Sequence, residues 1–351
     1  MSPQVMRSFR LGAGAALGVF LAWLVFRGTD WEKVAVLLGD LEVPWLLVAL
    51  TFASSGHLAR VQRWSYIVRA TQTVRFRTLF SAAQIGFLFN IALPLRLGEV
   101  VRALVLSRLA HLRLVTSVAL IALDRVADTL AFLTVVVIAI AALPTDQGAI
   151  LAGRAITSMP SPPLWVGLLT GMLGIGIVLF AISKGWGRHA RWEDASGPGL
   201  HSLLLRSTRR ITRSISSFLT PFRAFWLSEG VAPALVFSLL AWMCGVLSLA
   251  SGMRALHVTF PWNAPFLMQA MIGLFVIVPL TPGLVGQFHL PIVAALAITA
   301  PDVATTEAKA VALVAHVIML IPVVTFGVLG LATERLTLRE AARTGAEVQR
   351  A

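Results

Sequence analysis

Cysteine and charged residues are both scarce in this chain. The single cysteine among the 351 residues, Cys244, lies within an apolar run, and one thiol excludes an internal disulfide and a cysteine metal cluster. Charged residues make up only 13% of the chain, whereas hydrophobic residues make up 57% and the mean hydropathy is +0.83. This composition excludes a large soluble domain and is typical of an all-α, polytopic membrane protein.

Acidic residues are scarcer than basic ones, with 16 Asp and Glu against 29 Lys and Arg, which gives a net charge of +13. Such a balance also occurs in nucleic-acid-binding proteins, but here the basic residues are scattered through short segments between apolar runs. The excess of basic residues in the cytoplasmic loops of membrane proteins explains this distribution better. We therefore expect membrane lipids as partners and no nucleic acid.

Six apolar runs are predicted to cross the bilayer, at about residues 11–26, 44–58, 115–143, 164–182, 231–253 and 310–331. Two interrupted pairs of shorter runs lie between them, at about 79–93 with 100–109 and 266–280 with 288–300. The runs of the first pair reach only about 15 to 22 Å, short of the roughly 30 Å hydrocarbon core. We therefore predict about six full spans and two re-entrant helical hairpins.

Lysine and arginine are distributed unevenly over this layout. When both short pairs turn back, 23 of the 29 basic residues fall on one face and 5 on the other, with Arg125 inside a span. The basic face includes Arg60 and Arg63, because the second predicted span ends at Leu58. The positive-inside rule then places this face, and with it both termini, in the cytoplasm.

The tip of the first hairpin combines helix breakers with charged residues. Pro94 removes a backbone donor, and Gly98 permits a turn. Arg96, Glu99 and Arg102 lie among apolar neighbours and need partners or water. Such backbone is tolerated in a membrane only where it lines a protein-buried or wet cavity, which predicts a transport site. The alternative is an ordinary surface loop with a helical Glu99–Arg102 pair.

The second hairpin has a tip of the same kind, with breakers at Pro282, Gly283 and Gly286. Each hairpin lies between two long spans, and the resulting units, about 44–143 and 231–332, run in opposite directions across the membrane. Two inverted units with interrupted helices are the architecture of many secondary transporters. We therefore predict an inverted-repeat arrangement.

The segment between the two units, about 184–228, is rich in arginine and spaces its apolar residues loosely at helical intervals. This pattern indicates an amphipathic helix on an anionic leaflet, with a plain polar linker as the alternative. The whole chain, 1–351, is predicted to form a single integral membrane domain.

The predicted substrate-binding residues belong to the first hairpin and to the spans that follow each hairpin: Asn90, Arg96, Glu99, Arg102, Asp124, Arg125, Asp128 and His316. Arginines hold a phosphate through forked hydrogen bonds, and carboxylates neutralise those arginines when the site is empty. Two alternatives stay open. Asp124, Arg125 and Asp128 also suit a buried ion-pair clasp between helices, and His316 suits either packing or proton coupling.

These residues also resemble a family, the flippase-like membrane region of lysylphosphatidylglycerol synthases and its stand-alone bacterial and archaeal relatives. The resemblance rests on Asn90–Arg102, Asp124–Asp128, Pro279–Gly286, His316 and Pro322. It implies a protein of the bacterial inner membrane that moves lipids or lipid-linked groups between leaflets, here without the aminoacyl-transferase domain. The second hairpin departs from the commoner pattern, with Gly283-Leu284 and His289 where a Gly-Gly pair and a later glutamate are expected.

The expected function is that of a lipid flippase for an anionic phospholipid or a polyprenyl-phosphate-linked lipid. A membrane-embedded lipid head-group transferase and a small-anion transporter are the alternatives, and a homo-oligomer stays open. The chain contains no nucleophile motif and no histidine and carboxylate spacing suited to a metal. We therefore expect no catalytic residue, no metal and no cofactor.

Overall fold

A computed structural model describes residues 3–92, 97–143, 218–277 and 280–335 of the chain. Every regular element within these residues is a helix, which confirms the all-α prediction. The elements before residue 144 are α1 (Pro3–Phe26), α2 (Trp31–Gly39), α3 (Val43–Arg69), α4 (Phe76–Ala92), α5 (Leu97–Leu109) and α6 (Leu114–Ala141). The later ones are α10 (Val231–Ala255), α11 (Ala264–Phe275), the 3₁₀ turn η2 (Pro282–Leu284), α12 (His289–Thr299) and α13 (Thr305–Thr333).

Several of these helices are long and apolar enough to cross a membrane. Three stretches qualify singly, namely Val231–Ala255, Pro282–Thr299 and Thr305–Thr333. Helices α2 and α3 are bent by 89° at their junction, and they make a fourth candidate span if they are counted together. The count of six spans and the re-entrant hairpins therefore stay predictions. The span predicted at 164–182 and most of the connector at 184–228 lie outside the described residues.

Helix α3 is longer than its apolar run. The predicted span ends at Leu58, whereas α3 continues to Arg69, and the side chain of Arg63 is 0% exposed. Arg63, predicted to follow the span on the basic face, is instead buried inside the bundle. The helix continues because carboxylates on α6 neutralise this arginine inside the bundle.

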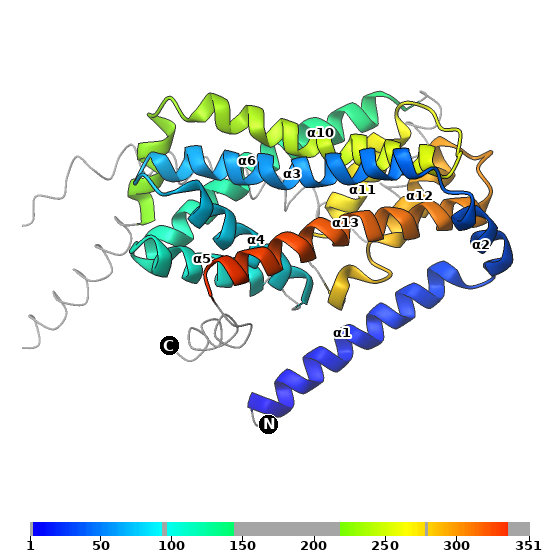
Figure 1. Cartoon of the computed structure of the whole chain (residues 1–351), viewed down its shortest axis with the longest axis horizontal. Helices are drawn as coiled ribbons and strands as arrows, with labels where there is room; N and C mark the ends of the chain where they lie inside the picture. Colours follow the sequence, from blue (N-terminus) through cyan, green and yellow to red (C-terminus); the bar gives the residue numbers. More distant parts are fainter. Residues whose placement is uncertain (1–2, 93–96, 144–217, 278–279, 336–351) are drawn as a thin grey trace, which may run out of the picture.

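The short helical pairs lie at opposite ends of the molecule. Figure 1 shows α3, α10 and α13 running along the long axis, with α4 and α5 toward one end and α11 and α12 toward the other. The apolar residues form two cores that match this division. One core holds Trp64, Leu106 and Leu120, and the other holds Met268 and Ile292. A polar site between the two cores would contact both hairpins.

The first hairpin depends on close backbone contact. Gly98, predicted as a turn glycine, instead lies in the first turn of α5, and its neighbour across the hairpin is Gly86 of α4. A Cβ at Gly98 would overlap the carbonyl oxygen of Gly86 and lie 2.5 Å from the backbone nitrogen of Asn90. The glycine thus permits two helices to touch. Pro94 and Arg96 lie outside the described residues.

The tip of the second hairpin has the backbone that its breakers predict. Pro282 begins η2, and Gly283 and Gly286 have φ values of +66° and +75°, a region that glycine adopts without steric cost. Leu284 between them also has a positive φ, of +58°, which strains a branched residue. Helix α1 packs against this tip, since a Cβ at Gly286 would lie 2.6 Å from the backbone nitrogen of Ala22.

Candidate functional site

Three arginines from three helices converge on one buried carboxylate. Arg63 Nε of α3 lies 2.7 Å from Asp124 Oδ1, and Arg102 Nη1 of α5 lies 2.7 Å from Asp124 Oδ2. Arg125 of α6 donates to the same Oδ2 at 2.9 Å. Asp124 and Arg63 are 0% exposed and Arg102 is 2% exposed, so this part of the network has no access to water.

The network continues from Asp124 toward the centre of the molecule through Asp128. Arg63 and Arg125 both pair with Asp128, the latter at 3.4 Å, and Trp242 of α10 donates its Nε1–H to Asp128 Oδ1 at 3.2 Å. Glu99 lies 3.8 Å from Arg125, which extends the network to the first hairpin. Four helices are therefore tied together by charge-assisted contacts, which are stronger than neutral hydrogen bonds.

Arg102 is held by an aromatic ring as well as by carboxylates. Its guanidinium carbon lies 3.6 Å from the ring centroid of Trp64, a close cation–π contact in a desolvated site. The buried pair with Asp124 and this ring fix the guanidinium on the α3 side of the hairpin. Arg102 and Asp124 therefore have the geometry of a clasp between helices.

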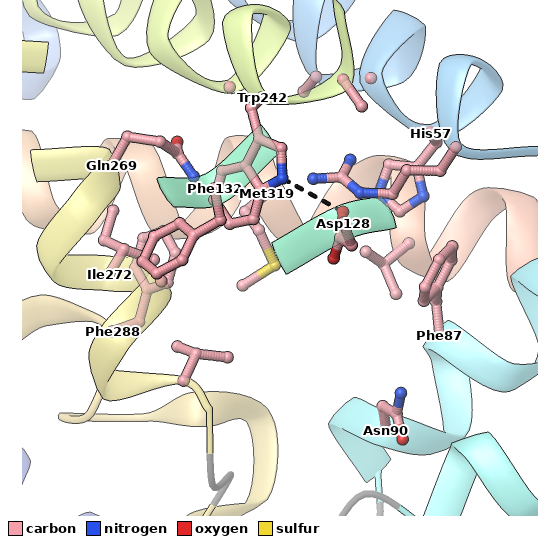
Figure 2. Close-up of a pocket in the computed structure, with 18 of the residues that line it drawn as sticks. His57, Phe87, Asn90, Asp128, Phe132, Trp242, Gln269, Ile272, Phe288 and Met319 are labelled. Carbon is pink, nitrogen blue, oxygen red and sulfur yellow. Dashed lines mark hydrogen bonds between the residues drawn. The ribbon is translucent and has the colours of Figure 1, made fainter. Parts of the chain in front are cut away.

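Beside the network lies a cavity of about 360 Å³. Its charged and polar lining includes His57, Arg60, Asn90, Glu99, Arg125 and Asp128, and its apolar lining includes Phe132, Leu249, Ile272, Leu284, Phe288 and Met319. In Figure 2, His57 and Asn90 lie to one side of the cavity, Ile272 and Phe288 to the other, and Asp128 between them. The cavity is thus amphipathic, with ionic groups from the first unit and apolar groups largely from the second.

Only some of the predicted substrate-binding residues line the cavity. Asn90, Glu99, Arg125 and Asp128 line the cavity. The amide of Asn90 donates to Glu99 Oε1 at 3.3 Å, so the two side chains are presented together.

Sequence reasoning missed three polar residues of α3 that complete the site: His57, Arg60 and Arg63. They are spaced three residues apart, so their side chains lie near the same face of the helix. This spacing would have revealed them only if the helix had been expected to pass Leu58. The imidazole of His57 is hydrogen-bonded to Gln84 Oε1 at 3.0 Å, so α4 is tied to the same face of α3.

His316 lies away from this network and holds the second tip. Gly286 N–H donates to His289 Nδ1 at 3.1 Å, which leaves the Nε2–H of His289 to donate to His316 Nδ1 at 3.0 Å. The Nε2–H of His316 then donates to the carbonyl of Gly283 at 2.9 Å. One set of neutral tautomers satisfies all three hydrogen bonds. His289 is therefore the partner of His316.

Within the described ranges, no group of three or more His, Cys, Asp or Glu side chains is placed to hold a metal ion. The chemistry that the described site offers is that of arginine and carboxylate: binding an anion, exchanging ion pairs and excluding water.

The long apolar helices and the ionic cavity among them define a helical integral membrane protein. A family model described as the lysylphosphatidylglycerol synthase TM region matches residues 12–327. The chain belongs to this family, which confirms the resemblance read from the hairpin motifs. Comparison with curated proteins gave no match.

Proposed function

We propose that this protein moves a lipid with an anionic head group between the two leaflets of a bacterial cytoplasmic membrane. The observation that carries the proposal is the amphipathic cavity, which places ionic groups and an apolar wall side by side among membrane-spanning helices. A head group must lose water on its way across, while its acyl chains stay in an apolar environment. Arginine and carboxylate groups that are already paired replace that water at little cost in reorganisation.

The arrangement of the hairpins supports an alternating-access route. The order of long, short, short and long helices in α3–α6 recurs in α10–α13. Arg125 lies eleven residues after the start of α6 and His316 eleven residues after the start of α13, and each contacts the second helix of its own hairpin. Two units related in this way can rock against each other about a fixed site.

Among the described cavity residues, Glu99 is the one best suited to release a head group. It lies on the hairpin, is 19% exposed, and its contact with Arg125 is long at 3.8 Å. An incoming anion can replace Glu99 at Arg125, whereas the 2.7 Å pair of Arg102 and Asp124 has no such freedom. The proposal assigns transport to Glu99 and Arg125, and holding the helices together to Arg102 and Asp124.

Reconstitution of the purified chain in liposomes tests the proposal. Fluorescent lipids placed in the inner leaflet become accessible to a membrane-impermeant reductant only when they are moved outward. We expect movement with the wild type, loss of it with Glu99→Gln, and no change with Arg108→Gln, which alters an exposed residue of the same helix. Movement that is equal in empty liposomes and in those with wild-type protein would contradict the proposal.

A further inference from the structure

The ionic network has more positive than negative charge. Its members in the described ranges are four arginines and three carboxylates: Arg60, Arg63, Arg102, Arg125, Glu99, Asp124 and Asp128. The excess is one positive charge, and any proton gained by His57 would only add to it. An unbalanced cation among membrane helices is expensive and is normally paired or functional. The described part of the network therefore has a place for one more negative charge.

Among the described arginines of this network, Arg60 is the one without a carboxylate oxygen within 4.0 Å. Arg63, Arg102 and Arg125 each have at least one carboxylate oxygen within 4.0 Å, whereas Arg60 has none within the described part of the chain and makes no hydrogen bond there. Asp128, the carboxylate that interacts electrostatically with Arg60, is already paired with Arg63, Arg125 and Trp242. Arg60 lines the cavity, so its guanidinium can meet a ligand there.

We infer that Arg60 and the cavity bind the phosphodiester group of a lipid that carries one net negative charge. This inference rests on the proposed function and narrows its substrate. A phosphodiester has a single negative charge and matches the excess charge of the network, whereas a phosphomonoester carries about 1.5 to 2 negative charges at neutral pH. A zwitterionic head group leaves the excess uncompensated. Phosphatidylglycerol-like lipids and polyprenyl phosphosugars both belong to the matching class.

The apolar wall favours a lipid over a free anion. Ile272, Phe288 and Met319 line the same cavity as Arg60. Burying apolar surface against them gives an acyl chain a binding energy that a soluble phosphate lacks. At about 360 Å³ the cavity is near the lower end of ligand pockets, which run from roughly 300 to 1,000 Å³. It therefore fits a head group and the first part of the chains, with the rest left in the membrane.

Binding to the full-length protein in detergent tests the inference without relying on transport. The probes are fluorescent phosphatidylglycerol, phosphatidylcholine and diacylglycerol. We expect the wild type to bind phosphatidylglycerol at least ten-fold more tightly than the other two. Arg60→Gln should weaken that binding about ten-fold or more, because it removes a charge-assisted contact, and leave diacylglycerol binding unchanged. Arg60→Lys keeps the positive charge but loses the forked guanidinium, so its affinity for phosphatidylglycerol should lie between those of the wild type and Arg60→Gln. Arg108→Gln is the matched control.

The outcomes separate this inference from the proposed function. If the wild type moves phosphatidylglycerol but binds all three lipids equally tightly, the charge assignment is overturned and the transport proposal stands. If Arg60 controls phosphatidylglycerol binding but the protein moves no lipid, the site stands and the transport proposal fails. If glycerophosphoglycerol, the same head group without chains, binds as tightly as the lipid, the ligand is a soluble phosphodiester and the lipid assignment is overturned.

Discussion

At the residue scale the site depends on Asp124, because three guanidinium groups share one carboxylate that is 0% exposed. A buried ion pair gains little over an apolar pair of the same size, but removing one partner leaves the other charged and desolvated. The clasp interpretation of Asp124, weighed from the sequence as an alternative, is the one that this geometry favours. Arg125 and Asp128 differ from Asp124. Arg125 contacts Asp124 and Asp128, and both residues also line the cavity.

Replacing Asp124 by Asn should therefore lower stability strongly. We expect a loss of about 3–5 kcal/mol, because three arginines lose their common counter-charge. Thermal unfolding of the purified protein in detergent measures the effect. Asp302→Asn, an exposed change at the loop before α13, is the control and should shift the unfolding temperature little. A variant Asp124→Asn as stable as the control would show that water reaches this carboxylate and that the clasp is not essential.

The double variant Asp124→Asn, Arg63→Gln sharpens this test. Since the two side chains pair at 2.7 Å, removing both should cost less than the sum of the single changes. Additive losses would indicate that the two residues act independently.

At the element scale each hairpin is fixed to the following long helix by a polar contact, ionic in the first unit and between imidazoles in the second. The first hairpin also needs its helices in backbone contact at Gly86 and Gly98. The second needs a positive φ at Leu284, a strained conformation that persists only where surrounding contacts hold it. The two tips are thus held by different chemistry.

Gly98→Ala should disrupt the first hairpin. The added methyl group meets backbone atoms of α4, which cannot move aside as a flexible side chain can. We expect loss of folded, monodisperse protein, measured by size-exclusion chromatography after extraction. Gly39→Ala is the control, because nothing lies within 4 Å of a Cβ at that position. It should be neutral or slightly stabilising, in keeping with the higher helix propensity of alanine.

His316→Phe should loosen the second tip without unfolding the chain. The change removes the hydrogen bond to the Gly283 carbonyl and leaves the Nε2–H of His289 without its acceptor. A reporter cysteine at Val285, placed in a Cys244→Ala background, should then react faster with a maleimide. His257→Phe, at an exposed histidine outside the tip, is the control. An unchanged labelling rate would mean that the other contacts of the tip, such as those with α1 and Gln287, hold it in place without His316.

At the scale of the whole molecule, the positions of the two hairpins decide the topology. If the first hairpin opens to the cytoplasm and the second to the outside, residues at their bases lie on opposite faces of the membrane. We expect Thr73→Cys, between α3 and α4, to be labelled only from the cytoplasm, and Asp302→Cys, between α12 and α13, only from outside. Both positions are exposed, and a Cys244→Ala background removes the native thiol. Labelling of both from one face would contradict the inverted arrangement.

Much of this architecture could be read from the sequence, because its causes are local. Apolar runs predicted where α6, α10 and α13 lie to within a few residues, since burial of an apolar helix in lipid needs no specific partner. Pro282, Gly283 and Gly286 predicted a turn for a similarly local reason, because proline restricts the backbone and glycine permits a positive φ whatever lies around them. The motif around Glu99 and Arg102 indicated the family, which the match over residues 12–327 confirms.

What depended on distant partners was decided only by the tertiary structure. Whether Arg63 ends a span or lies buried within a helix depends on carboxylates that are 61 and 65 residues away in sequence. Gly98 lets α4 and α5 touch only because Gly86 lies opposite it. His316 holds the second tip only because His289 lies within hydrogen-bond distance of it. The sequence shows how many charged residues the chain contains and their order. Which of the described charges pair with one another, and that Arg60 has no carboxylate oxygen within 4.0 Å among the described residues, follows from distances that only the packed helices determine.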